Sequence, residues 1–552
     1  MQKTSLLVLS ALLVLPLFSA EPLAPRLAVV ITVDQMRADY LERFRPYFGE
    51  GGFNRFLTEG AVYQNCHYRY SGTKTAAGHA TILSGMNPAV HGIIANEWMD
   101  RTTFAWGNAV EDTGSPLVGL PPRANRYQNA TFAAKAGRSP RNFLGSTVGD
   151  WLKARYGVAA KVVGVADKDR SAILPAGRRP DGAYWTEEGI FVTSAYYRAE
   201  LPAWVQDFNA RRNARSYHGQ VWDRLLAKEI YDRVQGPDDA PGEETSAGLP
   251  ATLPKQIGTP GQSPGGTFYS AFDRTPWNNE LVAGLAEQAL ESEQLGQDDT
   301  PDLLAVGFSQ PDAAGHAYGP DSHEVMDTYL RLDRTLAEFF KRLDEKVGAG
   351  RWIAVLTAEH GIPPLPERVQ AERGPDAAGR ISGRELDAHV TAALDAAFGA
   401  LPDSLVWALR DNASYHLHPK ALAAKNLPAE RVGAALREAL QRHPAIQSAY
   451  SREQLTAIGP LDEKGGMVRL SFHPARSGDV HFVEKPFFQI RSLGTTHGTP
   501  HDYDTHVPLA WFGPGVKPGT HPERVGVDDL APTLAALLGV EPAPEVQGRR
   551  LF

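Results

Sequence analysis

Four short apolar runs, each followed directly by polar residues, constrain the fold of this chain more than any other feature of its sequence. They are Leu27–Asp34, Lys161–Ala166, Leu303–Phe308 and Trp352–Thr357. A continuous apolar run of this length is typical of a strand that is buried on both faces of a parallel sheet. The polar residues after such strands gather at one edge of the sheet, where α/β proteins bind their ligands.

Helical patterns separate these runs. Apolar residues recur at intervals of three and four in Ser146–Arg155, Glu280–Leu295 and Val325–Leu343. The alternation of strands and helices predicts an α/β fold with a mostly parallel central sheet and helices on both faces. The stretch 237–266 is rich in Pro, Gly, Ser and Thr and is predicted to be a long surface loop.

A smaller second lobe is predicted between residues 382 and 479. Two helical patterns and a strand candidate alternate there: Glu385–Phe398, Ala429–Arg442 and Met467–Phe472. The core pattern then resumes at Leu509–Phe512 and continues in a helical pattern at Asp528–Leu538. We therefore expect an inserted α+β lobe in a catalytic core that comprises residues 21–381 and 480–552.

The first 20 residues form a predicted secretory signal peptide. Lys3 precedes the apolar stretch Leu6–Phe18, and the small residues Ser19 and Ala20 follow it. The alternative is a membrane anchor, but the stretch is shorter than the roughly 20 residues that a span needs. We expect a mature protein without a stable membrane span, secreted or periplasmic in a bacterium.

Charge and cysteine content argue against a nucleic-acid-binding protein and against a disulfide-linked fold. The 56 basic and 64 acidic residues give a net charge of -8, with no long run of either sign. This is a poor basis for contacts with nucleic acid, so a nucleic-acid partner is not expected. Cys66 is the single cysteine, which excludes an intramolecular disulfide. No sequence signal indicates an oligomeric state.

Six acidic and imidazole side chains fall at or just beyond strand ends or in Gly-containing segments: Asp34, Asp312, His316, Glu359, His360 and His497. Carboxylate and imidazole are ligand types that zinc accepts. Asp312 and His316 are four residues apart, so on a helix they would share one side. Such a pair also occurs on ordinary helices, and Glu359–His360 is equally consistent with a solvated strand end.

Thr75 precedes an apolar, helix-like segment, Ala80–Ser84. A threonine in this position is ordinarily an N-cap of the helix. The functional alternative is that the helix N-terminus binds a phosphoryl group through its amides and dipole, while a metal ion activates the Thr75 hydroxyl. The two roles can coincide.

The order of the motifs resembles the alkaline phosphatase superfamily. The motifs are Val33-Asp34, Thr75-Ala-Ala-Gly-His79, Asn87-Pro-Ala-Val-His-Gly92, Gln310-Pro-Asp-Ala-Ala-Gly-His316, Thr357-Ala-Glu-His-Gly361 and Thr495-Thr-His-Gly-Thr499. The resemblance extends from Asp34 to His497. It is greatest to the phosphate-irrepressible alkaline phosphatases that use threonine, and more distant to the nucleotide pyrophosphatase/phosphodiesterases.

The resemblance implies a site with two zinc ions. Asp312, His316 and His497 would hold one ion, while Asp34, Glu359 and His360 would hold the other, with Thr75 bridging toward the phosphoryl group. Asn96 matches the family asparagine that donates to a phosphoryl oxygen, although an asparagine in a turn is the alternative. Most members carry Asp-His where this chain has Glu359-His360, so this carboxylate is one methylene longer.

Lys168 and Arg170 match the Lys-x-Arg pair with which the threonine-type phosphatases bind phosphoryl oxygens. If the chain stays extended there, residues two apart project to the same side. The alternative is a solvated charge cluster, since Asp167 and Asp169 flank the pair. Extra cations favour a phosphate monoester, which carries more charge on its non-bridging oxygens than a diester.

The resulting prediction is a secreted two-zinc alkaline phosphatase that hydrolyses small phosphate monoesters through a phosphothreonine at Thr75. Inorganic phosphate is the second product. Two alternatives stay open: a phosphodiesterase or nucleotide pyrophosphatase on the same scaffold, and a zinc- or phosphate-binding protein in which Glu359 leaves the site inert.

Overall fold

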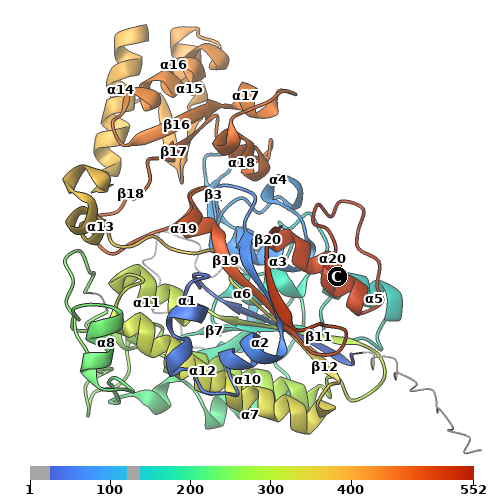
Figure 1. Cartoon of the computed structure of the whole chain (residues 1–552). Coiled ribbons are helices and arrows are strands. Elements are labelled where there is room, and N and C mark those ends of the chain that lie inside the picture. Colours follow the sequence, from blue (N-terminus) through green and yellow to red (C-terminus); the bar gives the residue numbers. More distant parts are fainter. Residues whose placement is uncertain (1–24, 121–136, 246) are drawn as a thin grey trace, which may run out of the picture.

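The computed structural model describes residues 25–120, 137–245 and 247–552, and the predicted signal peptide lies outside them. In this part of the chain, ten strands form one mixed sheet in the order β20-β2-β19-β12-β1-β11-β6-β7-β8-β5 (Figure 1). The strands are β1 (Leu27–Val33), β2 (Ala61–His67), β5 (Leu117–Val118), β6 (Val162–Ala166), β7 (Gly182–Glu187), β8 (Ile190–Ser194), β11 (Asp302–Phe308), β12 (Trp352–Thr357), β19 (His506–Phe512) and β20 (Gly519–Gly526).

The four predicted strands are confirmed, and they are neighbours at the centre of this sheet. β1 pairs in parallel with β11 and β12, and β11 pairs in parallel with β6. All four are buried along their whole length. Because they run in the same direction, their carboxyl ends meet at one edge. The sheet is parallel at its centre, whereas β19 and β8 introduce antiparallel pairing on the two sides.

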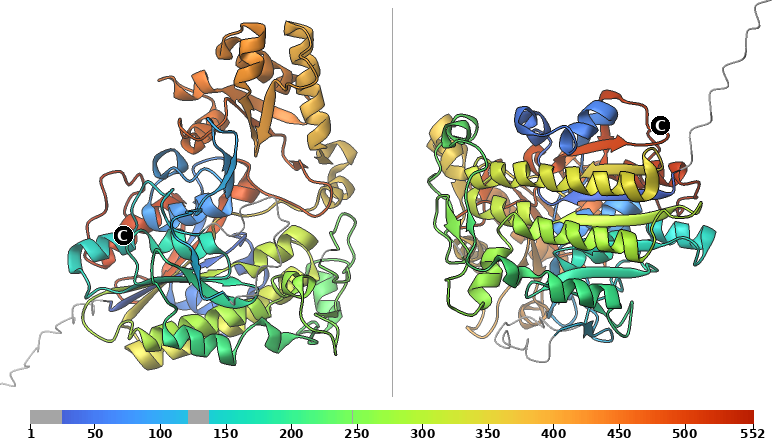
Figure 2. Two further views of the ribbon diagram at one scale, coloured as in Figure 1. Left: turned by 180° about the vertical axis from the view of Figure 1, so that it is seen from behind. Right: turned by 90° about the horizontal axis from the view of Figure 1, so that it is seen from below.

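Helices cover both faces of the sheet, as predicted (Figure 2). One face carries α10 (Trp277–Ser292) and α12 (His323–Leu343), and the other carries α3 (Thr75–Ser84), α5 (Val148–Tyr156), α6 (Asp169–Ala176) and α20 (Leu530–Leu537). The predicted helices in this part of the chain agree with α5, α10 and α12 to within a few residues. Cys66 is buried in β2, in the hydrophobic core.

The smaller lobe stands apart from the core at the top of Figure 1. Its described strands form an antiparallel sheet in the order β14 (Ala408–Asp411), β15 (Ser414–Leu417), β17 (Val480–Glu484) and β16 (Ile446–Ser451). Helices α14 (Gly383–Phe398) and α16 (Ala429–Arg442) pack on this sheet around a separate apolar cluster. The lobe boundary predicted at residue 479 is too early, because β17 belongs to the lobe sheet.

The strand predicted at Met467–Phe472 is wrong, because this segment lies in helix α18 (Glu463–Ser471). The side chain of Asp462 accepts a hydrogen bond from the amide of Gly465 and caps the helix. Met467 and Val468 are buried on one side of the helix, with Val468 in a small apolar cluster. Two adjacent apolar residues fit one face of a helix as well as they fit a short strand.

The predicted surface loop 237–266 contains a two-residue strand, β10 (Lys255–Gln256), among its described residues. It pairs antiparallel with β9 (Val221–Trp222). None of the helices in the described ranges combines the length and the apolar character that a membrane span requires.

Candidate active site

The candidate metal ligands lie where the central strands end. Asp34 directly follows β1, and Glu359 and His360 follow β12. Asp312 and His316 lie on α11 (Gln310–Tyr318), the helix that begins after β11, as their spacing predicted. His497 comes from the loop before α19 (Asp502–Thr505). The parallel register of the strands therefore brings residues that are distant in sequence to one edge of the sheet.

These side chains lie close together around two adjacent positions. His316 Nε2 is 3.2 Å from Asp312 Oδ1, and the rings of His316 and His497 have centroids 5.1 Å apart. His360 Nε2 lies 3.0 Å from Glu359 Oε1 and 4.0 Å from Asp312 Oδ1. His360 thus lies between the two carboxylates, and its ring stacks on that of His497 with centroids 3.3 Å apart.

Each of the three imidazoles is oriented by a backbone carbonyl. Nδ1 of His316 donates to Thr495 O, that of His497 to Thr73 O and that of His360 to Gly361 O, at 2.8, 2.6 and 2.9 Å. A proton on Nδ1 leaves the lone pair of Nε2 free for a metal ion, the usual arrangement of ligand histidines. Burial and the neighbouring His360 keep the pKa of His497 well below its ordinary value, so that its ring is neutral.

Two buried polar atoms in this cluster have no hydrogen-bond partner among the described residues. They are Glu359 Oε1 and His360 Nε2, which lie 3.0 Å apart but do not form a hydrogen bond, because the ring proton of His360 is on Nδ1 and is donated to Gly361 O. Leaving such groups without a partner is unfavourable, and buried polar atoms normally have one. A metal ion between a carboxylate oxygen and an imidazole nitrogen would satisfy both, so these residues fit a metal site.

His79 also joins the site: it belongs to the Thr75–His79 motif, but no role is assigned to it at the level of sequence. His79 Nε2 donates to Asp34 Oδ1 at 2.9 Å. Considered by ligand-atom distances alone, the described residues form one triad of Asp312, His360 and His497 and another of Asp34, His79 and Glu359. These triads differ from the ligand sets implied by the family resemblance. His360 groups with Asp312 and His497 rather than with Asp34 and Glu359, His79 takes its place beside Asp34 and Glu359, and His316 belongs to neither triad.

Lys168 connects the two triads. Its Nζ is 3.2 Å from Asp34 Oδ2 and 2.6 Å from Asp312 Oδ2. Burial alone would lower the pKa of Lys168. The attraction of the Asp312 and Asp34 carboxylates is larger, so the pKa of Lys168 is raised. Although burial would raise the pKa of Asp312, Lys168 and His316 hold it well below its usual value. Both groups are therefore charged.

Arg170 does not follow Lys168 in an extended chain. Helix α6 begins at Asp169, and Lys168 is its N-cap residue. Arg170 lies in the first turn with Nη1 3.5 Å from Asp169 Oδ1, and no contact among the described residues joins it to the triads. The extended chain that would let Lys168 and Arg170 project to the same side is therefore absent at these residues. The N-terminus of α6 nevertheless lies at the same sheet edge, because α6 packs against α3.

Thr75 is the first residue of α3 rather than its N-cap, which is Lys74. The N-cap interpretation of Thr75 is therefore wrong: the Thr75 hydroxyl does not cap the helix. Asn96 satisfies one free amide of the first turn instead, because its Oδ1 accepts from Ala76 N at 2.8 Å. This orientation leaves the Asn96 Nδ2 group available as a donor near the first turn of α3.

The start of α3 contacts residues of both triads. His497 donates to the carbonyl of Thr73, and His79 donates to Asp34. At Gly78 an added Cβ would lie 2.3 Å from the carbonyl oxygen of Glu359, so only glycine allows this close approach. Thr75 therefore lies in a segment, Thr73–His79, that contacts residues of both triads.

Gln35 is a site residue that sequence reasoning missed. It directly follows Asp34 and has a left-handed backbone with φ 66°. In this conformation its amide donates to Glu359 Oε2 at 2.9 Å, and its side-chain Nε2 donates to Asp312 Oδ1 at 2.6 Å. Gly315 permits this packing, because a Cβ there would lie 1.8 Å from Gln35 Oε1. One buried residue thus orients a carboxylate in each triad.

Replacing Gln35 with methionine is expected to weaken zinc binding by about 10- to 100-fold, the usual cost of losing a group that orients a metal ligand. The substitution keeps the length of the side chain and removes its donor. The measurement is zinc affinity by competition with a chromophoric chelator. Gln64→Met, at an exposed position of β2, is the matched control. Equal affinity of Gln35→Met and wild-type protein would contradict this role.

The fold and the site together define a member of the alkaline phosphatase superfamily. The model of the type I phosphodiesterase / nucleotide pyrophosphatase family matches residues 28–504, and the chain belongs to this family.

Two relatives and one solved structure extend this finding. Alkaline phosphatase PafA of Elizabethkingia meningoseptica is 34% identical, over 95% of both chains. Alkaline phosphatase PhoV of Synechococcus elongatus is 32% identical over 94% of this chain and 90% of its own. A crystal structure of alkaline phosphatase PafA superimposes with a TM-score of 0.86 at 33% identity, covering 96% of this chain and 98% of that one.

Proposed function

We propose that this protein is a secreted alkaline phosphatase that hydrolyses phosphate monoesters with Thr75 as the nucleophile and two zinc ions as cofactors. The single observation that carries the proposal is the position of Thr75: it begins a helix whose first turns contact both triads. Relatives named as alkaline phosphatases, similar over nearly their whole length, support phosphoric monoester hydrolysis. Secretion rests on the predicted signal peptide at residues 1–20.

In this proposal Asp312, His316 and His497 hold one zinc ion, and Asp34, Glu359 and His360 hold the other. When bound, the two ions would lower the pKa of the attacking hydroxyl and stabilise charge on the departing oxygen. His79 orients Asp34 through its hydrogen bond, and Gln35 orients Glu359 and Asp312. Gly78 allows α3 to approach the backbone and Cβ of Glu359 closely.

The chemistry has two displacements. Thr75 Oγ forms a bond to phosphorus as the bond from phosphorus to the alcohol oxygen breaks, and the alcohol leaves with a proton. Water then forms a bond to phosphorus as the bond to Thr75 Oγ breaks, which releases inorganic phosphate. In this proposal the amides of the α3 N-terminus and Asn96 Nδ2 stabilise the phosphoryl oxygens in both steps.

Replacing both Lys168 and Arg170 with alanine is expected to lower kcat/KM for an aryl phosphate monoester by about 10²–10³-fold, and that for the matched diester by less than about tenfold. The reason is that the monoester dianion offers these cations more charge than the diester does. Initial rates on both substrates measure the effect. The control is the double alanine variant of Lys420 and Arg384, which are exposed in the lobe. Equal losses on both substrates would refute the assigned role.

The phosphodiesterase alternative is favoured by the description of the matching family model. Comparing wild-type turnover of an aryl monoester with that of a diester of the same leaving group separates the two functions. We expect the monoester to be preferred, because Lys168 adds a cation beside the site. A preference for the diester would establish the alternative, whereas bound zinc without turnover of either substrate would indicate an inert binding protein.

A further inference from the structure

A cavity of about 220 Å³ lies between the core and the inserted lobe. Its core wall includes Lys74, the residue before Thr75, and His497, the proposed zinc ligand. Lys74 Nζ donates to the carbonyl oxygen of His497 at 2.9 Å, so this wall directly adjoins the reaction centre. The lobe contributes residues of α18 and β17 to the opposite wall.

The position of the cavity is suited to the alcohol part of the ester, which is the leaving group. In an in-line displacement the departing oxygen lies opposite the attacking one. His497, a proposed zinc ligand, is also part of the cavity wall, so a group that departs on the side of His497 would enter the space under the lobe.

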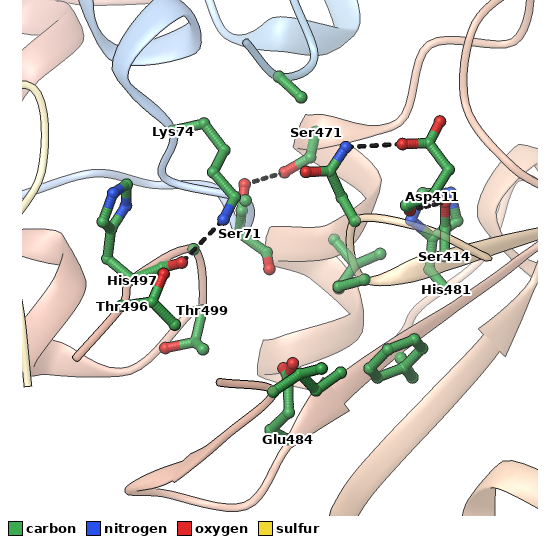
Figure 3. Close-up of a pocket in the computed structure, with 18 of the residues that line it drawn as sticks. Ser71, Lys74, Asp411, Ser414, Ser471, His481, Glu484, Thr496, His497 and Thr499 are labelled. Carbon is green, nitrogen blue, oxygen red and sulfur yellow. Dashed lines mark hydrogen bonds between the residues drawn. The ribbon is translucent and has the colours of Figure 1, made fainter. Parts of the chain in front are cut away.

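The walls of the cavity carry opposite charges that do not pair. Figure 3 shows Lys74 reaching in from the core and Glu484 from lobe strand β17 on the other side. Within the described residues no ion pair joins them, and burial raises the pKa of Glu484. The lining also holds Arg410 and Asp411, so that Lys74 and Arg410 balance Glu484 and Asp411, and the cavity offers neither a cation nor an anion a net attraction. A neutral guest that both accepts and donates hydrogen bonds satisfies both walls.

The remaining lining is suited to hydroxyl groups. Ser71, Ser414, Ser471, Thr496 and Thr499 surround the space (Figure 3). The hydroxyls of Ser414, Ser471 and Thr499 donate to Asp411 O, Ser71 O and Asp504 Oδ2, so toward a guest they act as acceptors of hydroxyl protons. Apolar rings, among them Phe482 and Tyr503, complete the wall. The volume is below the roughly 300 Å³ at which pockets for drug-sized ligands begin, so the guest is of monosaccharide size.

We propose that this cavity binds the leaving group of the substrate and selects a neutral, hydroxyl-bearing group of monosaccharide size, so that sugar phosphates are preferred substrates. This inference rests on the proposed monoesterase function and specifies its substrate class. The lobe thereby supplies specificity, while the core supplies the chemistry.

Obstructing the cavity tests the proposal. Ile490 lines it, whereas Ile458 is fully exposed on the lobe, so Ile490→Trp and Ile458→Trp form a matched pair. We expect Ile490→Trp to lower kcat/KM for ribose 5-phosphate by about tenfold or more, with methyl phosphate changed by less than about twofold. The inhibition constant of inorganic phosphate should be unchanged, because the phosphoryl site is intact. Val468→Phe, from α18, should reproduce the pattern.

A second pair of variants tests the chemical class. Glu484→Gln should lower kcat/KM for ribose 5-phosphate by about five- to tenfold and leave phenyl phosphate unchanged; Glu430→Gln, exposed on α16, is the control. Equal losses for ribose 5-phosphate and methyl phosphate in Ile490→Trp, or no loss, would overturn the proposal. So would equal effects of Glu484→Gln on ribose 5-phosphate and phenyl phosphate.

The binding of esters to Thr75→Ala protein separates this inference from the proposed function. If the wild-type protein hydrolyses none of the esters, the proposed function fails. The cavity is then judged by affinity alone: ribose 5-phosphate should bind the Thr75→Ala protein more tightly than methyl phosphate, and Ile490→Trp should abolish the difference. Equal affinities would overturn the cavity proposal independently of turnover.

Discussion

Replacing Thr75 with alanine is expected to lower the turnover of phosphate monoesters by about 10³–10⁶-fold, the range seen when a nucleophile is removed. Thr75 is 2% exposed and begins α3, the helix whose first turns contact both triads, so its loss removes the proposed attacking oxygen. Metal and substrate binding should persist, because the substitution removes only the hydroxyl and methyl groups. Steady-state rates with an aryl monoester measure the effect.

Two variants serve as controls for this loss. Thr58→Ala, at an exposed position of α2 (Phe53–Glu59), should behave as wild-type. Thr75→Ser should retain much of the activity, because it keeps a hydroxyl at the same place. Turnover of Thr75→Ala above about a tenth of the wild-type rate would show that the nucleophile lies elsewhere.

Removing the metal ions is expected to lower activity to about 1% or less, because the ions both activate the attacking hydroxyl and stabilise the departing oxygen. The stability of the protein should fall as well, since a ligand that binds only the folded state stabilises it. Without ions, the buried oxygen of Glu359 and nitrogen of His360 stay unpartnered. Activity and melting temperature after dialysis against a chelator measure both effects.

Zinc should restore this activity and magnesium should not, because imidazole ligands suit zinc and magnesium prefers oxygen. Elemental analysis of the restored protein should find two zinc ions per chain, one for each triad of described residues. Full activity after complete metal removal, or saturation at a single ion, would contradict the two-ion site.

The central strands could be predicted because a strand buried on both faces requires an uninterrupted apolar run. β1, β6, β11 and β12 all meet this requirement, and their carboxyl ends located the candidate ligands. The lobe was harder to delimit: β17 has a mixed pattern of buried and partly buried residues, so the predicted boundary fell just before it.

The finer geometry of the site depends on contacts that local patterns do not carry. Gln35 reaches Asp312 and Glu359 because its backbone is left-handed, a conformation that its sequence context does not indicate. His79 could have been suspected, since helical spacing places it one turn beyond Thr75. Arg170 was expected in an extended segment, but the helix α6 begins one residue before it.

The most direct test of the account is to quench the enzyme with acid during turnover of a ³²P-labelled monoester and to locate the label by peptide mapping. We expect label on Thr75, in the peptide that begins α3, and none in Thr75→Ala protein. Label on another residue, or steady turnover with no labelled protein, would contradict it.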